Sequence, residues 1–202
     1  MSVIEAVVFD IGNVLVEWNP RHLYRKVFTD EARMEAFLAD ICTMEWHVEH
    51  DRGVSFESNA APLKERHPEH AELIDLWGDR QLEMNAGPVP GTAALLSKLK
   101  QRGVPVHGLT NMPSPVFPAL CERFPELCLL EKVVVSGDEG VIKPDPRIFE
   151  ILIERAALDP RATLYIDDSQ RNVDAAVALG FRSHHFRDAD GLALDLVRLG
   201  LA

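Results

Sequence analysis

Carboxylates that directly follow short apolar runs are the residues of this chain best suited to chemistry. Asp10 follows a β-branched and aromatic run, and Asp167 follows a second run of this kind. Such runs are typical of buried strands. An ionised carboxylate at the end of a buried strand costs free energy unless it is paired or bound to a cation, so Asp10 is a candidate nucleophile or metal ligand. Gly12 allows the backbone beyond it to turn sharply near a ligand. Taken alone, Asp10 equally fits a residue that caps a turn.

Two carboxylates from neighbouring strand ends suit a hard cation. Mg²⁺ prefers oxygen ligands and is usually held by one or two carboxylates together with a substrate phosphate. We expect Asp10 and Asp167 to supply these ligands, with a backbone carbonyl near Gly12 as a third. The chemistry that this pattern predicts is phosphoryl transfer, for which a carboxylate can act as the covalent nucleophile.

Polar side chains elsewhere in the chain can complete a phosphate site. Thr110 and Asn111 follow another predicted strand and can donate hydrogen bonds to phosphoryl oxygens. Lys143 can neutralise both a phosphate and the attacking carboxylate, which matters because a formal net charge of −11 repels anionic substrates. Asn172 lies one turn into the helix after Asp168 and can orient the lysine or a metal ligand.

These side chains need a sheet that brings the ends of several strands together. We predict strands over residues 3–9, 104–109, 132–136, 163–166 and 182–186. Beyond residue 88 the strands alternate with helices, a pattern typical of an α/β fold with a doubly wound parallel sheet and helices on both faces. The carboxyl ends of parallel strands lie along one edge, where ligands bind, so the polar strand ends are expected to meet there.

The segment between the first strand and residue 88 has a different pattern. No strand of similar quality is expected from about residue 20 to 88, and apolar residues recur there at spacings of three and four. We predict helices over residues 21–28, 31–44, 55–66 and 72–84. The chain is therefore expected to divide into a core, residues 1–17 and 89–202, and an inserted helical cap, residues 18–88.

Composition argues against several classes of function. The 202 residues are 47% hydrophobic and 26% charged, as in a globular protein with a good core. The negative charge and the lack of a basic run argue against a nucleic-acid partner. No apolar stretch approaches the length of a membrane span, and the N-terminus lacks the pattern of a signal peptide. Three cysteines without metal-ligand spacing are typical of a reduced, cytoplasmic protein. The oligomeric state stays open.

Four motifs in order along the chain resemble those of the haloacid dehalogenase-like (HAD) hydrolase superfamily. They are Phe9-Asp10-Ile11-Gly12-Asn13-Val14-Leu15, Leu109-Thr110-Asn111, Lys143-Pro144-Asp145-Pro146-Arg147-Ile148-Phe149, and Ile166-Asp167-Asp168 with Asn172. The resemblance covers essentially the whole chain, with the helical segment in the place of the family's cap. It implies that Asp10 is the nucleophile, that Thr110 and Asn111 contact phosphate, and that Lys143 stabilises charge.

The resemblance also implies a metal site and exposes one departure. Asp167 would be the second Mg²⁺ ligand, and Asp168 would support the metal shell. Phosphatases of this family usually carry a second Asp, acting as general acid and base, at the position of Gly12. A missing acid typically costs roughly 10²–10⁴-fold in rate, and less when the leaving group is stable unprotonated. The pattern around Gly12 is similar to a subgroup that contains α-D-glucose-1-phosphate phosphatase, whose leaving hemiacetal oxygen is less basic. His47 or His50 is a candidate replacement acid.

The function predicted from the sequence is that of a Mg²⁺-dependent phosphatase. It would act on a small phosphorylated metabolite, with a sugar 1-phosphate as one candidate, through an aspartyl-phosphate intermediate. A metal-free 2-haloacid dehalogenase is the first alternative, although the acidic pair Asp167-Asp168 favours a Mg²⁺ site. A binding or regulatory protein that keeps the fold without turnover is the second.

Overall fold

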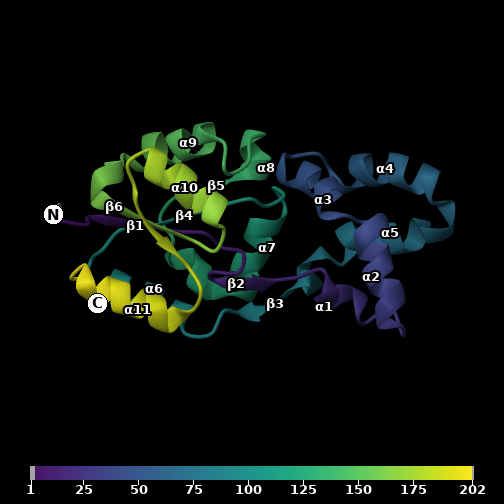
Figure 1. The fold of residues 1–202 in the computed structure, drawn as a ribbon, viewed down its shortest axis with the longest axis horizontal. Helices are drawn as coiled ribbons and strands as arrows, with labels where there is room; N and C mark the ends of the chain where they lie inside the picture. Colours follow the sequence, from purple (N-terminus) through teal and green to yellow (C-terminus); the bar gives the residue numbers. More distant parts are fainter. Residues whose placement is uncertain (1–2, 202) are drawn as a thin grey trace.

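A five-stranded parallel sheet forms the centre of the computed structural model, which describes residues 3–201 (Figure 1). The strand order is β5-β4-β1-β6-β7, with every neighbouring pair parallel. The strands are β1 (Ala6–Phe9), β4 (Val106–Thr110), β5 (Val133–Val135), β6 (Thr163–Asp167) and β7 (Arg182–His185). Each predicted strand of the sheet overlaps one of these, and the expected doubly wound α/β fold is confirmed.

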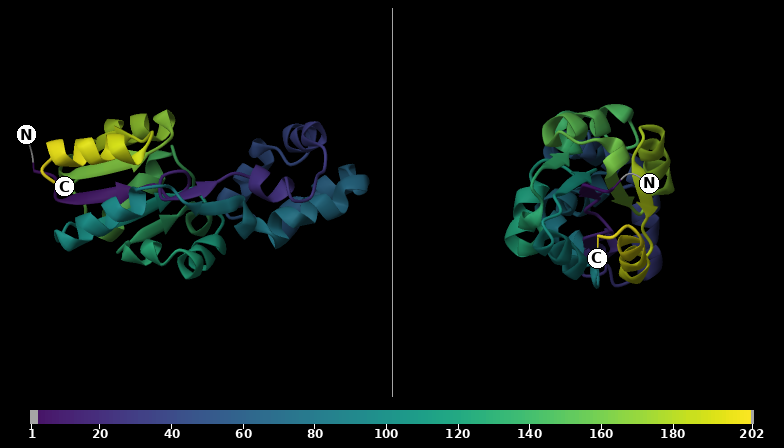
Figure 2. Two further views of the ribbon diagram at one scale, coloured as in Figure 1. Left: turned by 90° about the horizontal axis from the view of Figure 1, so that it is seen from below. Right: turned by 90° about the vertical axis from the view of Figure 1, so that its left-hand side faces the viewer.

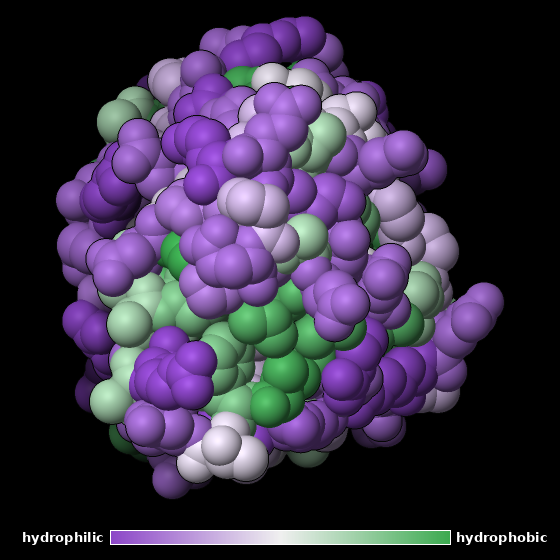
Figure 3. Space-filling view, turned by 90° about the vertical axis from the view of Figure 1, so that its right-hand side faces the viewer, coloured by the Kyte–Doolittle hydropathy of each residue, from purple (hydrophilic) through white to green (hydrophobic). Residues whose placement is uncertain are grey.

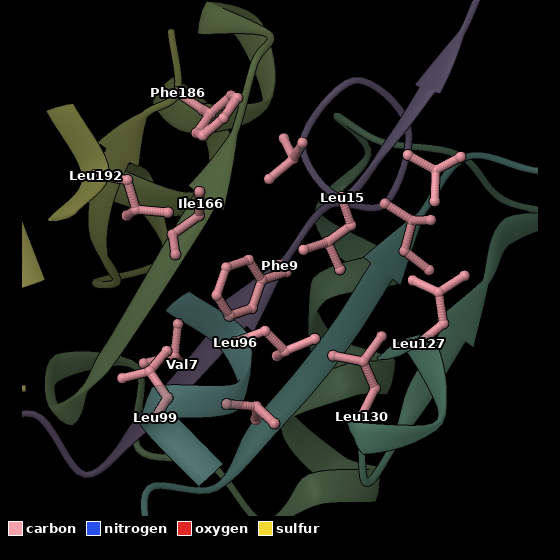
Figure 4. Close-up of a cluster of buried hydrophobic side chains, with 14 of the residues drawn as sticks. Val7, Phe9, Leu15, Leu96, Leu99, Leu127, Leu130, Ile166, Phe186 and Leu192 are labelled. Carbon is pink, nitrogen blue, oxygen red and sulfur yellow. The ribbon is translucent and has the colours of Figure 1, made fainter. Parts of the chain in front are cut away.

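Side chains of alternate residues in β1 pack on opposite faces of the sheet. Val7 and Phe9 pack in one apolar cluster with Leu96 (Figure 4), whereas Val8 packs in another with Phe149. The first face is covered by α6 (Thr92–Gln101), α7 (Val116–Arg123) and α11 (Ala189–Arg198), and the second by α9 (Pro146–Ala156) and α10 (Gln170–Ala178). Burial on both faces explains why β1 reads as an unbroken apolar run.

Residues 21–84 form a helical lobe beside the sheet, drawn at the right of Figure 1. Its elements are α1 (Arg21–Tyr24), α2 (Glu31–Asp40), α3 (Met44–Asp51), α4 (Phe56–Arg66), η1 (Pro68–His70), α5 (Ala71–Asp79) and η2 (Gln81–Met84). The lobe has its own apolar cluster, which includes Tyr24, Phe37 and Trp77. The left-hand view of Figure 2 shows the same separation from the sheet. Seen from the end of the lobe, the surface has an apolar area within mostly hydrophilic surroundings (Figure 3).

Two expectations for this segment are corrected by the structure. A strand does occur before residue 88: β3 (Asn85–Pro88) pairs antiparallel with β2 (Val16–Trp18) in a two-stranded ribbon between the sheet and the lobe. Gly and Pro are poor strand residues, so pairing with β2 decides this conformation rather than local propensity. The helix predicted over 31–44 ends at Asp40, because Thr43 caps a new helix by accepting a hydrogen bond from the backbone N–H of Trp46.

Short helical turns complete the fold. They are η3 (Pro125–Leu129), α8 (Ser136–Glu139) and η4 (Pro160–Ala162). The turn α8 follows β5 directly, at the carboxyl edge of the sheet, and it contacts α3 of the helical lobe. Within residues 3–201, no helix combines the length and the apolar character that crossing a membrane requires.

Candidate active site

The ends of three adjacent strands bring the predicted polar residues together. Central strand β1 pairs with β4 on one side and β6 on the other, with Phe9 level with both Gly108 and Ile166. The next residue along β1 is Asp10, and the next along β6 is Asp167. The two carboxylates expected from the sequence therefore lie side by side at the carboxyl edge of the sheet.

Lys143 lies between these two carboxylates. Its Nζ is 2.9 Å from Asp10 Oδ1 and 2.8 Å from Asp167 Oδ2, and it donates a third bond of 3.0 Å to the carbonyl of Leu109. Its side chain is almost fully buried. Asn111 fixes the backbone of the lysine, because its Oδ1 accepts from the N–H of Lys143 and its Nδ2 donates to the carbonyl. Lys143 therefore lies where it can neutralise the carboxylate of Asp10, the candidate nucleophile.

Asp167 is held by a shell of donors besides the lysine. Asn172 Nδ2 donates to both carboxylate oxygens at 3.0 and 3.1 Å, and the backbone N–H of Ser169 donates at 2.8 Å. The hydroxyl of Tyr165 donates to Oδ2. With no exposed surface, Asp167 is fixed in place, and Asn172 orients this carboxylate rather than the lysine.

Burial and neighbouring charges set the ionisation of the site. Burial raises the pKa of Asp10 to about 8; the Lys143 ammonium opposes the rise, and Asp167 and Asp168 add to it. Burial also acts to raise the pKa of Asp167, but Lys143 and the hydrogen bonds outweigh it, so this pKa lies below its usual value. Two buried carboxylates thus share one ammonium, and when both are ionised the site is one positive charge short.

A divalent cation fits this shortage of positive charge. Carboxylate oxygens of Asp10, Asp167 and Asp168 all lie within 4.8 Å of one another. An all-oxygen donor set of this kind matches the preference of Mg²⁺. Asp168 is only partly buried and lines the cavity at the strand ends, whereas the oxygens of Asp167 are engaged by the donors described above.

The cavity at the strand ends is formed by both parts of the chain. Its lining from the sheet side includes Asp10, Gly12, Asn111, Lys143, Asp168 and Asn172, and its lining from the ribbon and the helical lobe includes Trp18, Met44, His47, Asp51, Gln81 and Asn85. A Cβ placed on Gly12 would meet nothing within 4 Å, so space stays open two residues after Asp10. Thr110 is buried at the end of β4 and is not among the residues that line this cavity.

Two residues of the site were missed by sequence reasoning. Tyr165 is two residues before Asp167 on one strand, and alternate strand residues share a face, so its contact was predictable from spacing. Asp51 lines the cavity from the end of α3. It stands four residues after His47, which places both on one helix face, but it reads in the sequence only as part of a helix-breaking Asp-Arg-Gly.

The chain belongs to the haloacid dehalogenase-like hydrolase family, whose model matches residues 4–180. A sesquiterpene phosphatase, astK of Aspergillus oryzae, is 28% identical over 201 residues, covering 96% of each chain. The phosphoglycolate phosphatase of Yersinia pseudotuberculosis is 29% identical over 110 residues, which are 54% of this chain and 47% of that enzyme. The chain is therefore a member of a hydrolase family and has phosphatases among its relatives.

Solved structures show the same fold. A HAD-like hydrolase of Porphyromonas gingivalis superposes with a TM-score of 0.77 at 21% identity and covers 98% of each chain. The HAD family enzyme bt-2542 of Bacteroides thetaiotaomicron, in complex with magnesium and inorganic phosphate, gives a TM-score of 0.66 at 25% identity, covering 92% of this chain and 95% of that one.

Proposed function

We propose that the protein is a Mg²⁺-dependent phosphatase that hydrolyses a small phosphorylated metabolite through an aspartyl phosphate on Asp10. The observation that carries the proposal is the arrangement of Asp10 in the cavity, 2.9 Å from Lys143 and next to Asp167 and Asp168. Phosphoryl transfer depends mainly on positioning and on neutralising charge, and this arrangement is suited to both.

Each residue of the site has a proposed role. Asp10 attacks phosphorus, and Lys143 neutralises charge on the phosphoryl group and on the carboxylate. Asn111 and the backbone at Gly12 would contact the phosphoryl oxygens. Thr110, which the sequence predicts for the same contact, is buried outside the lining of the cavity. The hydrogen bonds between Asn111 and the backbone of Lys143 add a positioning role for this asparagine.

Asp10 and the carbonyl of Gly12 would hold the Mg²⁺ ion together with the acidic pair 167–168. Asp168 is the more accessible ligand of this pair, because Asp167 is enclosed by its hydrogen-bond donors. This shifts part of the role expected for Asp167 to Asp168, while Asp167 anchors Lys143. Bound Mg²⁺ would supply the positive charge that the two carboxylates lack and would attract the phosphate of the substrate.

We propose that residues 18–88 act as the cap over a core of residues 1–17 and 89–202. The cap supplies the side of the cavity that faces away from the sheet, so it would select the leaving group. Two substrate classes are candidates. A sugar 1-phosphate fits the resemblance to α-D-glucose-1-phosphate phosphatase, whereas the apolar lining by Trp18, Met44, Met112 and Val116 favours a phosphate on an apolar chain, as does the likeness to a sesquiterpene phosphatase.

The test is phosphate release from a panel of sugar 1-phosphates, prenyl phosphates and p-nitrophenyl phosphate, with Mg²⁺ and with EDTA. We expect Mg²⁺-dependent release that is abolished in Asp10→Asn and unchanged in Asp190→Asn, a matched change at an exposed position of α11. Added Mg²⁺ is also expected to raise the melting temperature, because a ligand that binds only the folded state stabilises it.

Two results would contradict this function. Release that is equal in EDTA and in Mg²⁺ would remove the metal from the proposal. A lack of release from every ester would favour either the dehalogenase, to be tested by metal-free chloride release from 2-haloacids, or phosphate-ester binding without turnover.

A further inference from the structure

Asp51 belongs to the helical lobe, and its backbone is held against the carboxyl edge of the sheet, where Asp10 and Asp167 lie. It ends α3 and lines the same cavity as Asp10 and Lys143. Its backbone carbonyl accepts a 2.6 Å hydrogen bond from the hydroxyl of Ser136, the first residue of α8. Close by, Gly53 packs so tightly on Gly137 that a Cβ on Gly53 would lie 2.5 Å from the carbonyl oxygen of Gly137. These contacts hold Asp51 in place relative to the nucleophile.

The side chain of Asp51 lacks the partners that a structural carboxylate has. The residue is only 7% exposed, and within the described residues its Oδ1 has no hydrogen-bond partner. Buried polar atoms are almost always paired, so an unpaired one calls for an explanation. Burial raises the pKa of Asp51 to about 7, with Lys143 opposing the rise. The group can therefore hold or release a proton near neutral pH.

His47 faces the unpaired oxygen in a defined tautomer. The indole N–H of Trp77 donates to His47 Nδ1 at 3.2 Å, and an indole nitrogen can only donate. The proton of a neutral His47 is therefore on Nε2, which lies 3.6 Å from Asp51 Oδ1. Burial lowers the pKa of His47 to about 3, so the ring is neutral. Its N–H is in position to support Asp51 when that carboxyl group ionises.

We propose that Asp51 is the general acid and base of the phosphatase reaction, in place of the side chain that Gly12 lacks, and that His47 is its positioning residue. This rests on the proposed phosphatase function. As Asp10 forms a bond to phosphorus and the bond to the leaving oxygen breaks, Asp51 gives its proton to that oxygen. The Asp51 carboxylate then takes a proton from the water that attacks the aspartyl phosphate, which releases phosphate and restores Asp10 and protonated Asp51.

The structure favours Asp51 over the histidines that the sequence suggested for this role. His50 does not line the cavity, and its ring is engaged by the carbonyl of Val54 and the side chain of Asn59. His47 lines the cavity, but its neutral ring receives a bond from Trp77 and faces Asp51. Burial lowers the pKa of His47 to about 3 and that of His50 to about 4, so only Asp51, of these three residues, has a pKa near neutrality.

The test compares phenyl phosphate with p-nitrophenyl phosphate, two esters of similar shape whose leaving groups differ in basicity. In Asp51→Asn we expect kcat/KM to fall roughly 10²–10⁴-fold for phenyl phosphate, which needs a proton donor, and less than about tenfold for p-nitrophenyl phosphate. Asp51→Asn also lacks the base that activates water, so hydrolysis of the aspartyl phosphate becomes slow. We therefore expect kcat for p-nitrophenyl phosphate to fall, after a burst in which each enzyme molecule releases one nitrophenolate. Asp40→Asn, a matched change on an exposed residue of the lobe, is expected to change neither value.

A measurement on the wild-type protein keeps the proposal testable if Asp51→Asn fails to fold. The ratio of kcat/KM for phenyl phosphate to that for p-nitrophenyl phosphate is expected to fall as pH rises above about 7, where Asp51 ionises. The other titratable groups lining the cavity, Asp10, His47, Lys143 and Asp168, act on the phosphoryl group common to both esters or on Asp51 itself.

Two outcomes overturn the role of Asp51 while leaving the phosphatase intact. One is an equal change in kcat/KM for both esters in Asp51→Asn, including no change in either. The other is a wild-type ratio that is flat with pH. If the wild-type protein hydrolyses neither ester nor any other member of the panel, the phosphatase function itself fails, and the role of Asp51 fails with it.

Discussion

At the scale of single residues, the site is built around one lysine that serves two carboxylates. Asp167 receives the Lys143 ammonium together with bonds from Tyr165, Ser169 and Asn172, and it stays ionised. Asp10 receives the same ammonium and one backbone N–H, that of Ile11, and burial keeps its pKa high. The difference between two identical side chains is set by their neighbours: Asp167 is held in place, and Asp10 stays available for the cation and the phosphoryl group that we propose.

The raised pKa of Asp51 leads to a prediction about stability and pH. In the unfolded chain Asp51 loses its proton near its usual pKa of about 3.9. Between about pH 4 and 7 the folded protein therefore holds a proton that the unfolded chain has lost, so stability falls as pH rises through this window. We measure the free energy of unfolding with urea in EDTA from about pH 5 to 8, and we expect the stability of wild type relative to Asp51→Asn to fall as pH rises.

The pH dependence that remains in that variant is assigned to Asp10, whose pKa is raised to about 8 and which acts with the same sign, and to His47 and His50, whose pKa values are lowered by burial and which act with the opposite sign. Parallel stability curves for wild type and Asp51→Asn would contradict a raised pKa for Asp51. Asp40→Asn serves as the control, since Asp40 is exposed at the end of α2.

At the scale of elements, the contact between α3 and α8 joins the helical lobe to the carboxyl edge of the sheet. Ser136 links both sides, because its hydroxyl donates to the carbonyl of Asp51 and accepts from the N–H of Met112. Gly53 and Gly137 allow the two backbones to approach closely at this point. The general acid that we propose therefore depends on a backbone contact between segments far apart in the sequence.

A pair of glycine substitutions tests this contact. Gly53 and Gly103 both have positive φ, at +93° and +75°, but only Gly53 has a neighbour that an added Cβ would strike. Gly103→Ala is expected to cost roughly 1–2 kcal/mol in free energy of unfolding, the usual penalty for a left-handed residue with a Cβ. Gly53→Ala should cost about 1–3 kcal/mol more, because the backbones must separate, and should lower hydrolysis of phenyl phosphate. Equal losses in urea unfolding for the two variants would show that the contact is loose.

At the scale of the whole molecule, the chain has separate apolar clusters on the sheet and in the helical lobe. The lobe cluster is built from residues 18–84, and the two sheet clusters draw mainly on residues outside that range. The two parts are joined by the β2–β3 ribbon, by the contact between α3 and α8, and by a contact between α7 and η2, where Arg123 donates to the carbonyl of Leu82. A unit with its own core and few connections can open without unfolding the rest.

Native-state hydrogen exchange in increasing urea is expected to show this independence. Amides of α2, α4 and α5 should exchange through an opening of lower free energy than amides of β1, β4 and β6. Gly53→Ala should lower the opening free energy of the lobe further and leave that of the sheet unchanged. If the amides of the lobe and those of the sheet exchange with the same opening free energy and the same dependence on urea, the chain unfolds as a single unit.

The sequence by itself determined the sheet, the order of its motifs and most of the charged site. Strands buried on both faces leave unbroken apolar runs, and their polar ends are visible as Asp10, Thr110-Asn111 and Asp167-Asp168. Residues on neighbouring strand ends meet because of sheet topology, which the alternation of strands and helices specifies. The local sequence pattern was therefore sufficient to predict a site residue wherever the position of its side chain follows from the strand that carries it.

The residues that reach the site from outside the sheet could be identified in the three-dimensional structure alone. The ribbon strand β3 has weak local propensity and forms through its partner β2. Asp51 reads as a helix end in the sequence, and it reaches the cavity because Ser136 and the Gly53–Gly137 contact dock α3 on the sheet. Docking of this kind depends on backbone contacts between distant segments, which leave no periodic pattern in either segment, so the partner of Asp10 across the cavity became visible only in three dimensions.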